Sequence, residues 1–391
     1  MDAKTNPPPA PADISLVRGG AFYRAEKLAR LIHPDRWNLV RRIVALITIG
    51  WLPLLVITAL WNPGGVHSFF MDYRVHSRLL VAVPALLVGE MIMDLRFRQM
   101  FNYIRHANLL NAPDLAYMDD VVAMLVRLRN AFLPEIIVLV LIIVRIASSY
   151  RGLVDTTPWM GREAGAGFHF TLAGWYAVLV TAPIWDFLLG LALWRWLLWT
   201  YFAFQLSRRD LQLTATHPDQ RGGLGFLGVS VSAFAPTAFA LTSVIAATLR
   251  HNIARHGAHL KDFRLDGIVL ALLVALVALG PLLFFVPGLI TLRRRGVLEY
   301  GVLGQLQSTE FEEKWIRRRA GREGEFFLAP EINALTGFGN KFEKIEQLQP
   351  FPADLPSLYG LAASVAIPAL FVVLAEIPFV VVLKDLMKAV H

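Results

Sequence analysis

The stretch VLVTAPIWDFLLGLALWRWLLWTYF, residues 178–202, is apolar over almost its whole length and holds only two charged side chains, Asp186 and Arg195. An α-helix crosses the hydrocarbon layer of a membrane in about 20 residues, so this stretch is long enough to span it. It ends in tryptophan, tyrosine and phenylalanine, which gather at membrane–water interfaces. The stretch therefore predicts a transmembrane helix with Asp186 deep inside it and Arg195 near one end.

Similar runs recur along the 391-residue chain, which is 55% hydrophobic and has a mean hydropathy of +0.50. A soluble domain of this size could not bury so much apolar surface in one core. The runs are too long and too uniformly apolar for barrel strands, so the predicted fold class is all-α, a polytopic transmembrane helical bundle of about seven spans. The expected spans are 43–60, 79–95, 131–149, 171–199, 224–249, 266–292 and 358–383.

The basic residues predict how the bundle is oriented. Lysine and arginine are frequent before the first span and in 96–130 and 293–357, and sparse in 61–78 and 150–170. By the positive-inside rule the N-terminus and the cation-rich segments are cytoplasmic. The same rule accounts for the net charge of +8 without nucleic acid as a partner. One connection disagrees, because it carries four cations on the predicted outer side: Arg250, Arg255, Lys261 and Arg264.

The predicted organisation has five parts. Proline-rich composition makes residues 1–17 a disordered tail. Apolar residues at helical spacing beside charged ones predict amphipathic cytoplasmic helices at 96–130 and 296–321, lying on the membrane or packing below the bundle. The parts are a tail at 1–17, a juxtamembrane helix at 18–42, the bundle at 43–292 with its cytoplasmic helix 96–130, a cytoplasmic segment at 293–357, and the last span with an amphipathic tail at 358–391.

Several function classes are excluded or disfavoured by what the chain lacks. It has no cysteine, so it forms no disulfide, thiolate metal site or cysteine nucleophile. No P-loop motif and no HExxH motif occurs, and no histidine falls mid-span to hold a haem. No metal site and no cofactor is predicted, and the expected partners are membrane lipids and either a second copy of the chain or another membrane protein.

Charged residues inside spans are costly in lipid and are candidate functional residues for that reason. The candidates are Asp186, Glu90, Arg195 and Glu376. Asp186 is too short and too deep to reach water, so we expect a partner from another helix, a proton or ion path, or a catalytic role. Glu90 is expected to meet Arg96 or Arg98, Arg195 to extend toward the interface among tryptophans, and Glu376 to begin an interfacial helix.

The stretch THPDQRGGLGFLG, residues 216–228, leads directly into an apolar run. Pro218 and the glycines suit a sharp turn, and Asp219 can accept hydrogen bonds from the N–H groups that follow it. The same free N–H groups beside Arg221 suit a lipid phosphate or another anion. A third reading is an acid–base pair. The candidate residues are His217, Asp219, Arg221, Gly222 and Gly223.

Three stretches together carry a resemblance to known sequences. They are WRWLLWTYFAFQLSRRDLQLTATHPDQRGGLGFLG at 194–228, RRRGVLEYG at 293–301 and EINALTGFGNKFE at 331–343. They resemble an uncharacterised group of bacterial multi-pass inner-membrane proteins that share a Thr-His-Pro-Asp and Gly-Gly-Leu-Gly-Phe-Leu signature. The likeness covers roughly residues 40 to 390. It implies a bacterial cytoplasmic-membrane location and no particular activity.

Three functions agree with these features. A channel or transporter is favoured by the charged residues inside spans, Asp186 above all. A membrane enzyme acting on a lipid or lipid-linked substrate would use the cytoplasmic loop 216–228. A scaffold or assembly protein would need none of these residues. A water-sized path through the bundle at Asp186 would favour transport, and a dry bundle with a cytoplasmic pocket would favour the enzyme.

Overall fold

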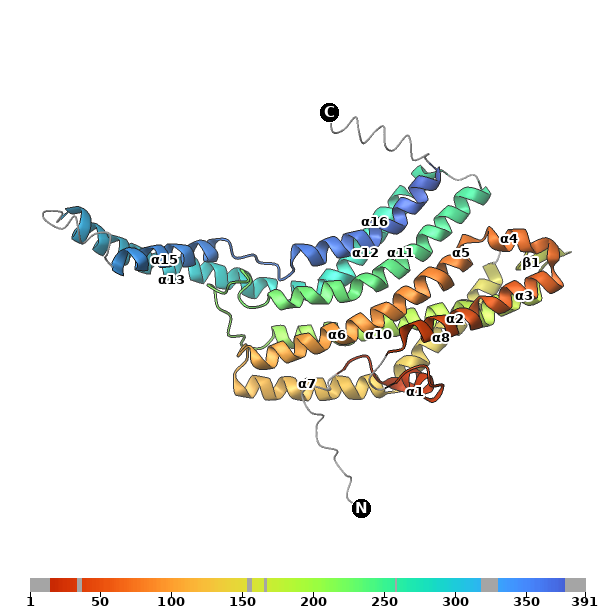
Figure 1. The fold of residues 1–391 in the computed structure, drawn as a ribbon, viewed down its shortest axis with the longest axis horizontal. Helices are drawn as coiled ribbons and strands as arrows, with labels where there is room; N and C mark the ends of the chain where they lie inside the picture. The colour runs from red at the N-terminus through yellow and green to blue at the C-terminus, as the bar shows by residue number, and fades with distance from the viewer. Residues whose placement is uncertain are drawn as a thin grey trace, which may run out of the picture.

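The computed structural model of the protein describes residues 15–33, 37–152, 157–164, 167–256, 259–317 and 330–376. The predicted all-α class is confirmed, because 82% of the structure is helical. Its only strands in those ranges form one small antiparallel hairpin, β1 (Gly161–Ala164) and β2 (Gly167–Phe170). The helices run side by side in a long bundle, and a helical arm projects from one end (Figure 1).

The first half of the chain forms one side of the bundle. Its helices are α1 (Gly20–Leu28), α2 (Leu39–Gly50), α3 (Leu52–Trp61), η2 (Pro63–Gly65), α4 (Val66–Phe70), α5 (Tyr73–His76), η3 (Ser77–Ala82), α6 (Val83–His106), α7 (Ala112–Asn130) and α8 (Leu133–Gly152). The second half contains α9 (Leu172–Tyr176), η4 (Ala177–Thr181), α10 (Ala182–Ser207), η5 (Gly225–Gly228), α11 (Val229–His256), η6 (Leu260–Phe263), α12 (Arg264–Leu283), α13 (Val286–Phe311), η7 (Glu312–Arg317), α15 (Pro330–Glu346) and α16 (Leu355–Glu376).

Five helical stretches of the described chain are long and apolar enough to cross a membrane, and a sixth qualifies if the bent pair α7 and α8 is one span. The five are Leu39–Trp61, Leu172–Ser207, Gly225–Arg255, Lys261–Leu283 and Leu355–Leu374. The predicted span 79–95 lies inside an unbroken helical stretch from Tyr73 to His106, which is long enough but more charged. Five or six spans are therefore established by composition, and seven stays a prediction.

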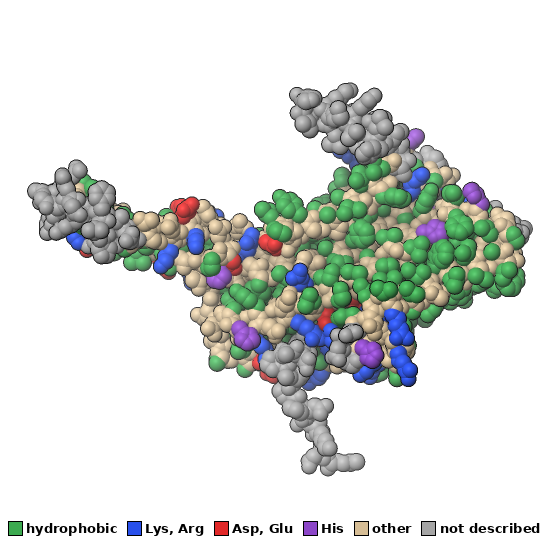
Figure 2. Space-filling view, viewed as in Figure 1, with side chains coloured by type: hydrophobic (Ala, Val, Ile, Leu, Met, Phe, Trp, Pro, Cys, Tyr) green, Lys and Arg blue, Asp and Glu red, His purple; other side chains and the backbone are tan. Residues whose placement is uncertain are grey.

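The stretch around α11 lies at the centre of the bundle. In the 18-residue segment by which this stretch qualifies as a span, 61% of the residues are buried, against 17% to 33% in the corresponding segments of the other four stretches. It packs against α6 on one side and α16 on the other. The outer helices instead expose leucine, isoleucine and valine. Hydrophobic side chains are spread over much of the face of the bundle in Figure 2. Apolar side chains on the outside as well as inside are what a lipid environment requires.

The structure corrects the predicted boundaries at three places. Residues 15–17 were predicted as disordered tail, but Leu16 and Val17 are fully buried in the bundle core. The predicted helix 18–42 is interrupted, since Arg30 and Asn38 have positive φ angles of 56° and 43°. The predicted helix 96–130 is two helices, the end of α6 and then α7, whose apolar face joins the core of the bundle.

The predicted span 266–292 also ends early, because the helix breaks at Phe284 and Phe285 and α13 begins at Val286. Pro287 favours this break, since proline has no N–H to give and fits the first turn of a new helix. Beyond it, α13 and α15 pack together as the arm that leaves the bundle (Figure 1). The predicted helix 296–321 is therefore part of an arm, and does not pack below the bundle. Residues 318–329 and 377–391 lie outside the described chain.

The two ends of the bundle differ in the elements that they carry. The arm end is where α13 and α15 project, and the hairpin end carries α4, β1 and β2 (Figure 1). At the hairpin end Trp159 is fully buried, and its indole N–H donates to Asp72 over 3.1 Å. The connection after β2 is fixed by Thr171, whose hydroxyl donates to the Trp159 carbonyl over 2.7 Å. These contacts position the residues at the mouth of a cavity described below.

Candidate functional site

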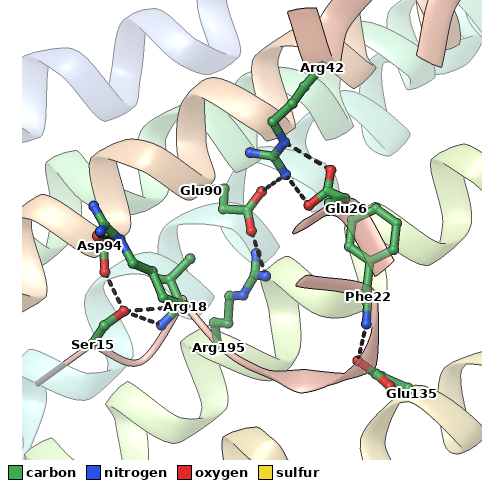
Figure 3. Close-up of polar contacts among 10 residues, drawn as sticks. Ser15, Arg18, Phe22, Glu26, Arg42, Glu90, Asp94, Glu135 and Arg195 are labelled. Carbon is green, nitrogen blue, oxygen red and sulfur yellow. Dashed lines mark hydrogen bonds and ion pairs between the residues drawn. The ribbon is translucent and has the colours of Figure 1, made fainter. Parts of the chain in front are cut away.

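Four charged side chains from four helices meet in the middle of the bundle and form the central charge cluster: Glu26 of α1, Arg42 of α2, Glu90 of α6 and Arg195 of α10 (Figure 3). Arg42 donates two hydrogen bonds of 2.9 Å to the Glu26 carboxylate. Glu90 accepts from Arg42 over 2.6 Å and from Arg195 over 2.7 Å. The chain Glu26–Arg42–Glu90–Arg195 thus alternates in sign and is neutral as a whole.

The cluster is shielded from solvent, since its four side chains are 0% to 9% exposed. Charges in such a place are stable only with close partners of opposite sign, and the remaining partners become uncompensated if one is removed. Burial raises the pKa of Glu26, which lies outside the spans, to about 6, although Arg42 opposes this. Arg42 Nη1 has no hydrogen-bond partner in the described part of the chain.

One turn further along α6, Asp94 extends this polar region. Its carboxylate accepts from the Ser15 hydroxyl, from Arg18 over 3.0 Å and from Arg98 over 3.1 Å (Figure 3). Ser15 and Asp94 are both buried, at 2% exposed. The segment before α1 is therefore held inside the bundle by charge-assisted hydrogen bonds as well as by apolar contact.

Two sequence-based expectations about this region are wrong. Glu90 was expected to meet Arg96 or Arg98, but it pairs with Arg42 and Arg195, and Arg98 pairs with Asp94. Arg195 was expected to extend toward the interface, but its side chain is buried. The reason is packing: α2, α6 and α10 come together at this depth, and their charges satisfy each other there without reaching water.

Asp186, the deepest candidate in the sequence, forms an ion pair with Arg145 of α8. The expectation that it has a polar partner from another helix is confirmed. The Asp186 side chain is 21% exposed and that of Arg145 is 42% exposed, so this pair lies at the edge of the bundle. It is nearer the hairpin end than the central charge cluster, since Asp186 precedes Arg195 by nine residues on α10.

Beside this pair lies a cavity of about 200 Å³, the hairpin-end cavity, lined by side chains from α5, η3, α8 and η4 and by Met160. Its charged lining residues are Asp72, Arg74, Arg78 and Arg145. Arg74 is paired with Asp72 over 3.0 Å, and Arg145 with Asp186. Arg78 has no carboxylate oxygen within 4.0 Å, and its buried Nε has no hydrogen-bond partner among the described residues.

Two π-helical turns border this cavity. One is η3, which contains Arg78, and the other is η4, which contributes Ala177, Val178 and Thr181 to the lining. A π-helical turn inserts one residue into an α-helix and is frequent at functional sites. Each turn lies just before a long helix of the bundle, η3 before α6 and η4 before α10. Both turns therefore border the same cavity as the three arginines.

The Asp72 carboxylate organises the mouth of the cavity. It caps the start of α5 by accepting from the Arg74 N–H, and it also accepts from Thr157 and Trp159. Burial works against its ionisation, but the hydrogen bonds and charge of Arg74 hold the pKa of Asp72 below its usual range, with help from His251. Asp72 is therefore an anion here and neutralises Arg74.

The hairpin-end cavity and the central charge cluster are separated by apolar packing. Arg78 and Glu90 are twelve residues apart on one helical stretch, about 18 Å at 1.5 Å per residue. Between them lies a core of side chains that are 0% to 6% exposed. Its members include Leu79, Ala82, Val83, Leu86, Leu87, Trp185, Leu188 and Ala192. These apolar side chains separate the two sites along α6 and α10.

The loop 216–228 is folded around its own carboxylate. Asp219 accepts from the N–H groups of Arg221 over 2.8 Å, Gly223 over 3.2 Å and Gly225 over 2.9 Å, and lies 2.7 Å from His217. Although burial opposes ionisation, these N–H groups hold the pKa of Asp219 below its usual range. The N–H groups that were expected to bind an external anion are already occupied by Asp219.

Two of the four glycines of this loop, Gly222 and Gly223, have positive φ angles and face the protein. Both are buried, and their φ angles of +64° and +94° favour glycine. A Cβ on Gly222 would lie 2.7 Å from the Leu292 side chain at the start of the arm. Arg221 donates to Gln349 over 2.6 Å, in the connection to α16. The geometry favours a turn that joins α10, the arm and α16, and its N–H groups bind Asp219 in place of an external anion. His217 and Asp219 are in contact, so the acid–base pair stays a prediction.

The last candidate, Glu376, ends α16, and its side chain lies outside what the structure describes, as do the residues expected to form the interfacial helix. Among the described residues no group of three or more histidine, aspartate and glutamate side chains is placed to bind a metal ion. Sequence reasoning missed Arg74, Arg78 and the partners of Glu90. Arg74 and Arg78 were interpreted as cations of a loop. In the structure they lie on helices beside a cavity, at and just before the π turn η3.

Fold and site together define a class: a multi-pass α-helical membrane protein with charged side chains buried inside its bundle. No family model, no curated protein and no solved structure matches the chain. The resemblance drawn from the loop signature is therefore neither supported nor opposed by these comparisons, and function has to be argued from the site.

Proposed function

We propose that this protein transports a small anion across the membrane and that the anion binds in the hairpin-end cavity beside Arg78. The observation that carries the proposal is the charge of the cavity lining. Arg74 and Arg145 are each paired with an aspartate, and Arg78 is not. The charges of the four charged lining residues and of Asp186, the partner of Arg145, therefore add up to +1.

Arg78 is partly buried and has no carboxylate within ion-pair distance among the described residues, although Asp186 acts on it from further away. Such a cation is unfavourable in a bundle surrounded by lipid. An anion in the cavity would compensate Arg78 and could accept hydrogen bonds from its guanidinium, whose planar fork suits carboxylate and phosphate oxygens. The volume of about 200 Å³ restricts the ligand to a small ion such as chloride, acetate or inorganic phosphate. Its polar lining distinguishes this cavity from the lipid-facing apolar surface around it.

Transport requires that the apolar packing between the cavity and the central charge cluster opens in another state. The π-helical turns η3 and η4 are suited to this, because π-bulges are among the places where long helices bend. In the present state the cavity is closed toward the arm end by the apolar core, and the central charge cluster ties α1, α2, α6 and α10 together below it. This arrangement is expected of a carrier with one side closed.

The proposed location is the bacterial cytoplasmic membrane, with the N-terminus and the arm in the cytoplasm and the hairpin end outside. The support is the distribution of lysine and arginine along the sequence. The chain has no cysteine, so a single introduced thiol reports its own side of the membrane. Gly64 at the hairpin end and Gly337 on the arm are suitable positions, since an added Cβ would meet no atom within 4 Å at either.

We expect an impermeant maleimide to label Gly64→Cys in intact cells, and to label Gly337→Cys only after the cells are lysed. Both variants should be folded and present in equal amounts, because neither side chain meets the protein. Labelling of Gly337→Cys in intact cells, with Gly64→Cys protected, would invert the proposed orientation.

The proposed activity is tested in proteoliposomes with gradients of radiolabelled chloride, acetate or inorganic phosphate. We expect flux of at least one of these ions, and a fall of about tenfold or more in Arg78→Gln, because a hydrogen bond to a charged group contributes about 1.5–3 kcal/mol. Arg78→Lys keeps the charge and should keep part of the flux. Arg250→Gln is the matched control, since Arg250 lies over Tyr73 outside the cavity lining. Equal flux in wild type and Arg78→Gln would refute the proposal.

A further inference from the structure

A second hollow of the bundle, the α11–α12–α16 groove, lies on a different side from the hairpin-end cavity. It has a volume of about 350 Å³ and is bordered by the last turns of α11 and α16, by η6 and by the first turns of α12. Most of its lining is aliphatic, from Ile245, Ala246 and Leu249 of α11 to Val365, Ala369 and Val372 of α16. An added Cβ on Gly267 of α12, which also lines the groove, would meet no atom within 4 Å.

Two cations mark one end of this groove. Lys261 and Arg264 line it where η6 leads into α12, and both are exposed. The structure gives neither of them an ion pair with any described residue. The nearby carboxylate of Asp262 is engaged as a cap, accepting from the His259 N–H over 2.9 Å. The uncharged run of α12 begins at Gly267, after Arg264 and Asp266, so these cations lie close to where the helix enters the membrane.

A neighbouring hollow is similar in size and apolar lining but has no cations, which distinguishes it from this groove. It has a similar volume of about 330 Å³, is lined by α5, η3, α11 and α16, and is also mostly apolar. No lysine or arginine lines it; its polar members are Tyr73, His76, Ser77 and Ser243. Of these two hollows, the α11–α12–α16 groove is the one that combines an apolar trough with a pair of cations at the interface.

We infer that the α11–α12–α16 groove binds an anionic phospholipid, with an acyl chain along the trough and the phosphate at Lys261 and Arg264. Apolar side chains of three helices match a hydrocarbon chain, and two cations that form no ion pair with a described residue match an anionic headgroup. The assignment also accounts for two of the four cations of the connection between α11 and α12, Lys261 and Arg264, which the positive-inside rule does not explain on the proposed outer side. It does not depend on the proposed transport function.

The test measures lipid binding to the full-length protein in detergent by native mass spectrometry. The probes are phosphatidylglycerol, which is anionic, and phosphatidylethanolamine, which is zwitterionic. Lys261→Gln combined with Arg264→Gln should weaken phosphatidylglycerol binding about thirtyfold, since each cation at an anionic surface contributes about a factor of five. Binding of phosphatidylethanolamine should not change. Arg255→Gln removes a cation of the same connection that does not line the groove, and serves as the control.

A second variant tests the trough independently of charge. Gly267→Leu should fill the groove and weaken binding of both lipids, whereas Gly280→Leu, at an equally open position of α12 outside the groove, should change neither. The inference is overturned if phosphatidylglycerol binds equally to wild type and to the Lys261→Gln, Arg264→Gln variant. It is also overturned if Gly267→Leu retains full lipid binding, or if it dissociates a dimer of the chain, which would make a second copy the occupant.

Discussion

Glu90→Ala is expected to reduce the yield of folded protein in the membrane to a small fraction of wild type. The substitution removes the shared acceptor of Arg42 and Arg195 and leaves two buried guanidinium groups, with only Glu26 to compensate them. Removing one member of a buried ion pair costs about 3–5 kcal/mol, which is a large part of the stability of most proteins. The measurement is the fraction of monodisperse protein after solubilisation, together with its midpoint of thermal unfolding.

Two further variants test whether the loss of charge balance causes the expected loss of folded protein. Asp119→Asn breaks the ion pair with Arg105, in which the aspartate is 46% exposed, so a change below about 1 kcal/mol is expected there. Glu90→Gln combined with Arg195→Gln removes one charge of each sign, keeps the shape of the Glu90 side chain and shortens that of Arg195. It should recover most of the folded yield that Glu90→Gln alone loses. If the double variant is no better than the single one, the central charge cluster does not act through charge balance.

The fold class could be predicted because lipid imposes one dominant requirement, an apolar helix of spanning length, and composition records it directly. The break between α12 and α13 was missed, since the apolar run continues through Phe284 and Phe285 and only Pro287 indicates the turn. The burial of Leu16 and Val17 was missed for a similar reason: a proline-rich start obscures a short segment whose ordering comes from Asp94 and other distant residues.

For the site, the sequence identified single residues but not their partners. Asp186 could be singled out because one short carboxylate deep in an apolar run must find a partner in any bundle. That this partner is Arg145 depends on how α8 packs on α10, which the sequence does not show. Glu90 was assigned neighbours on its own helix, whereas its partners are 48 and 105 residues away. Arg78 was counted as a loop cation, because the π turns that place it in a cavity leave no recognised pattern in the sequence.

The contact that shapes the mouth of the hairpin-end cavity is between Gly174 of α9 and Met160, one of the lining residues. The Met160 carbonyl lies against the first turn of α9 and accepts from the N–H of Thr171 over 2.9 Å and from its hydroxyl over 3.1 Å. A Cβ on Gly174 would lie 1.9 Å from this carbonyl oxygen and 2.9 Å from its carbon. Both are backbone atoms, so no rotamer change can relieve the overlap.

Gly174→Ala is therefore expected to destabilise the protein by about 3 kcal/mol, near the upper end for overpacking, and to displace Met160 together with the neighbouring Trp159. Because Trp159 donates to Asp72, the variant should also impair any anion binding that the cavity supports. Gly360→Ala is the matched control: Gly360 lies in α16 with no atom within 4 Å of an added Cβ, and alanine there should stabilise by up to about 1 kcal/mol. Thermal unfolding of both variants in detergent measures the two effects. A Gly174→Ala protein as stable as wild type would mean that the Met160 segment does not pack on α9 as described.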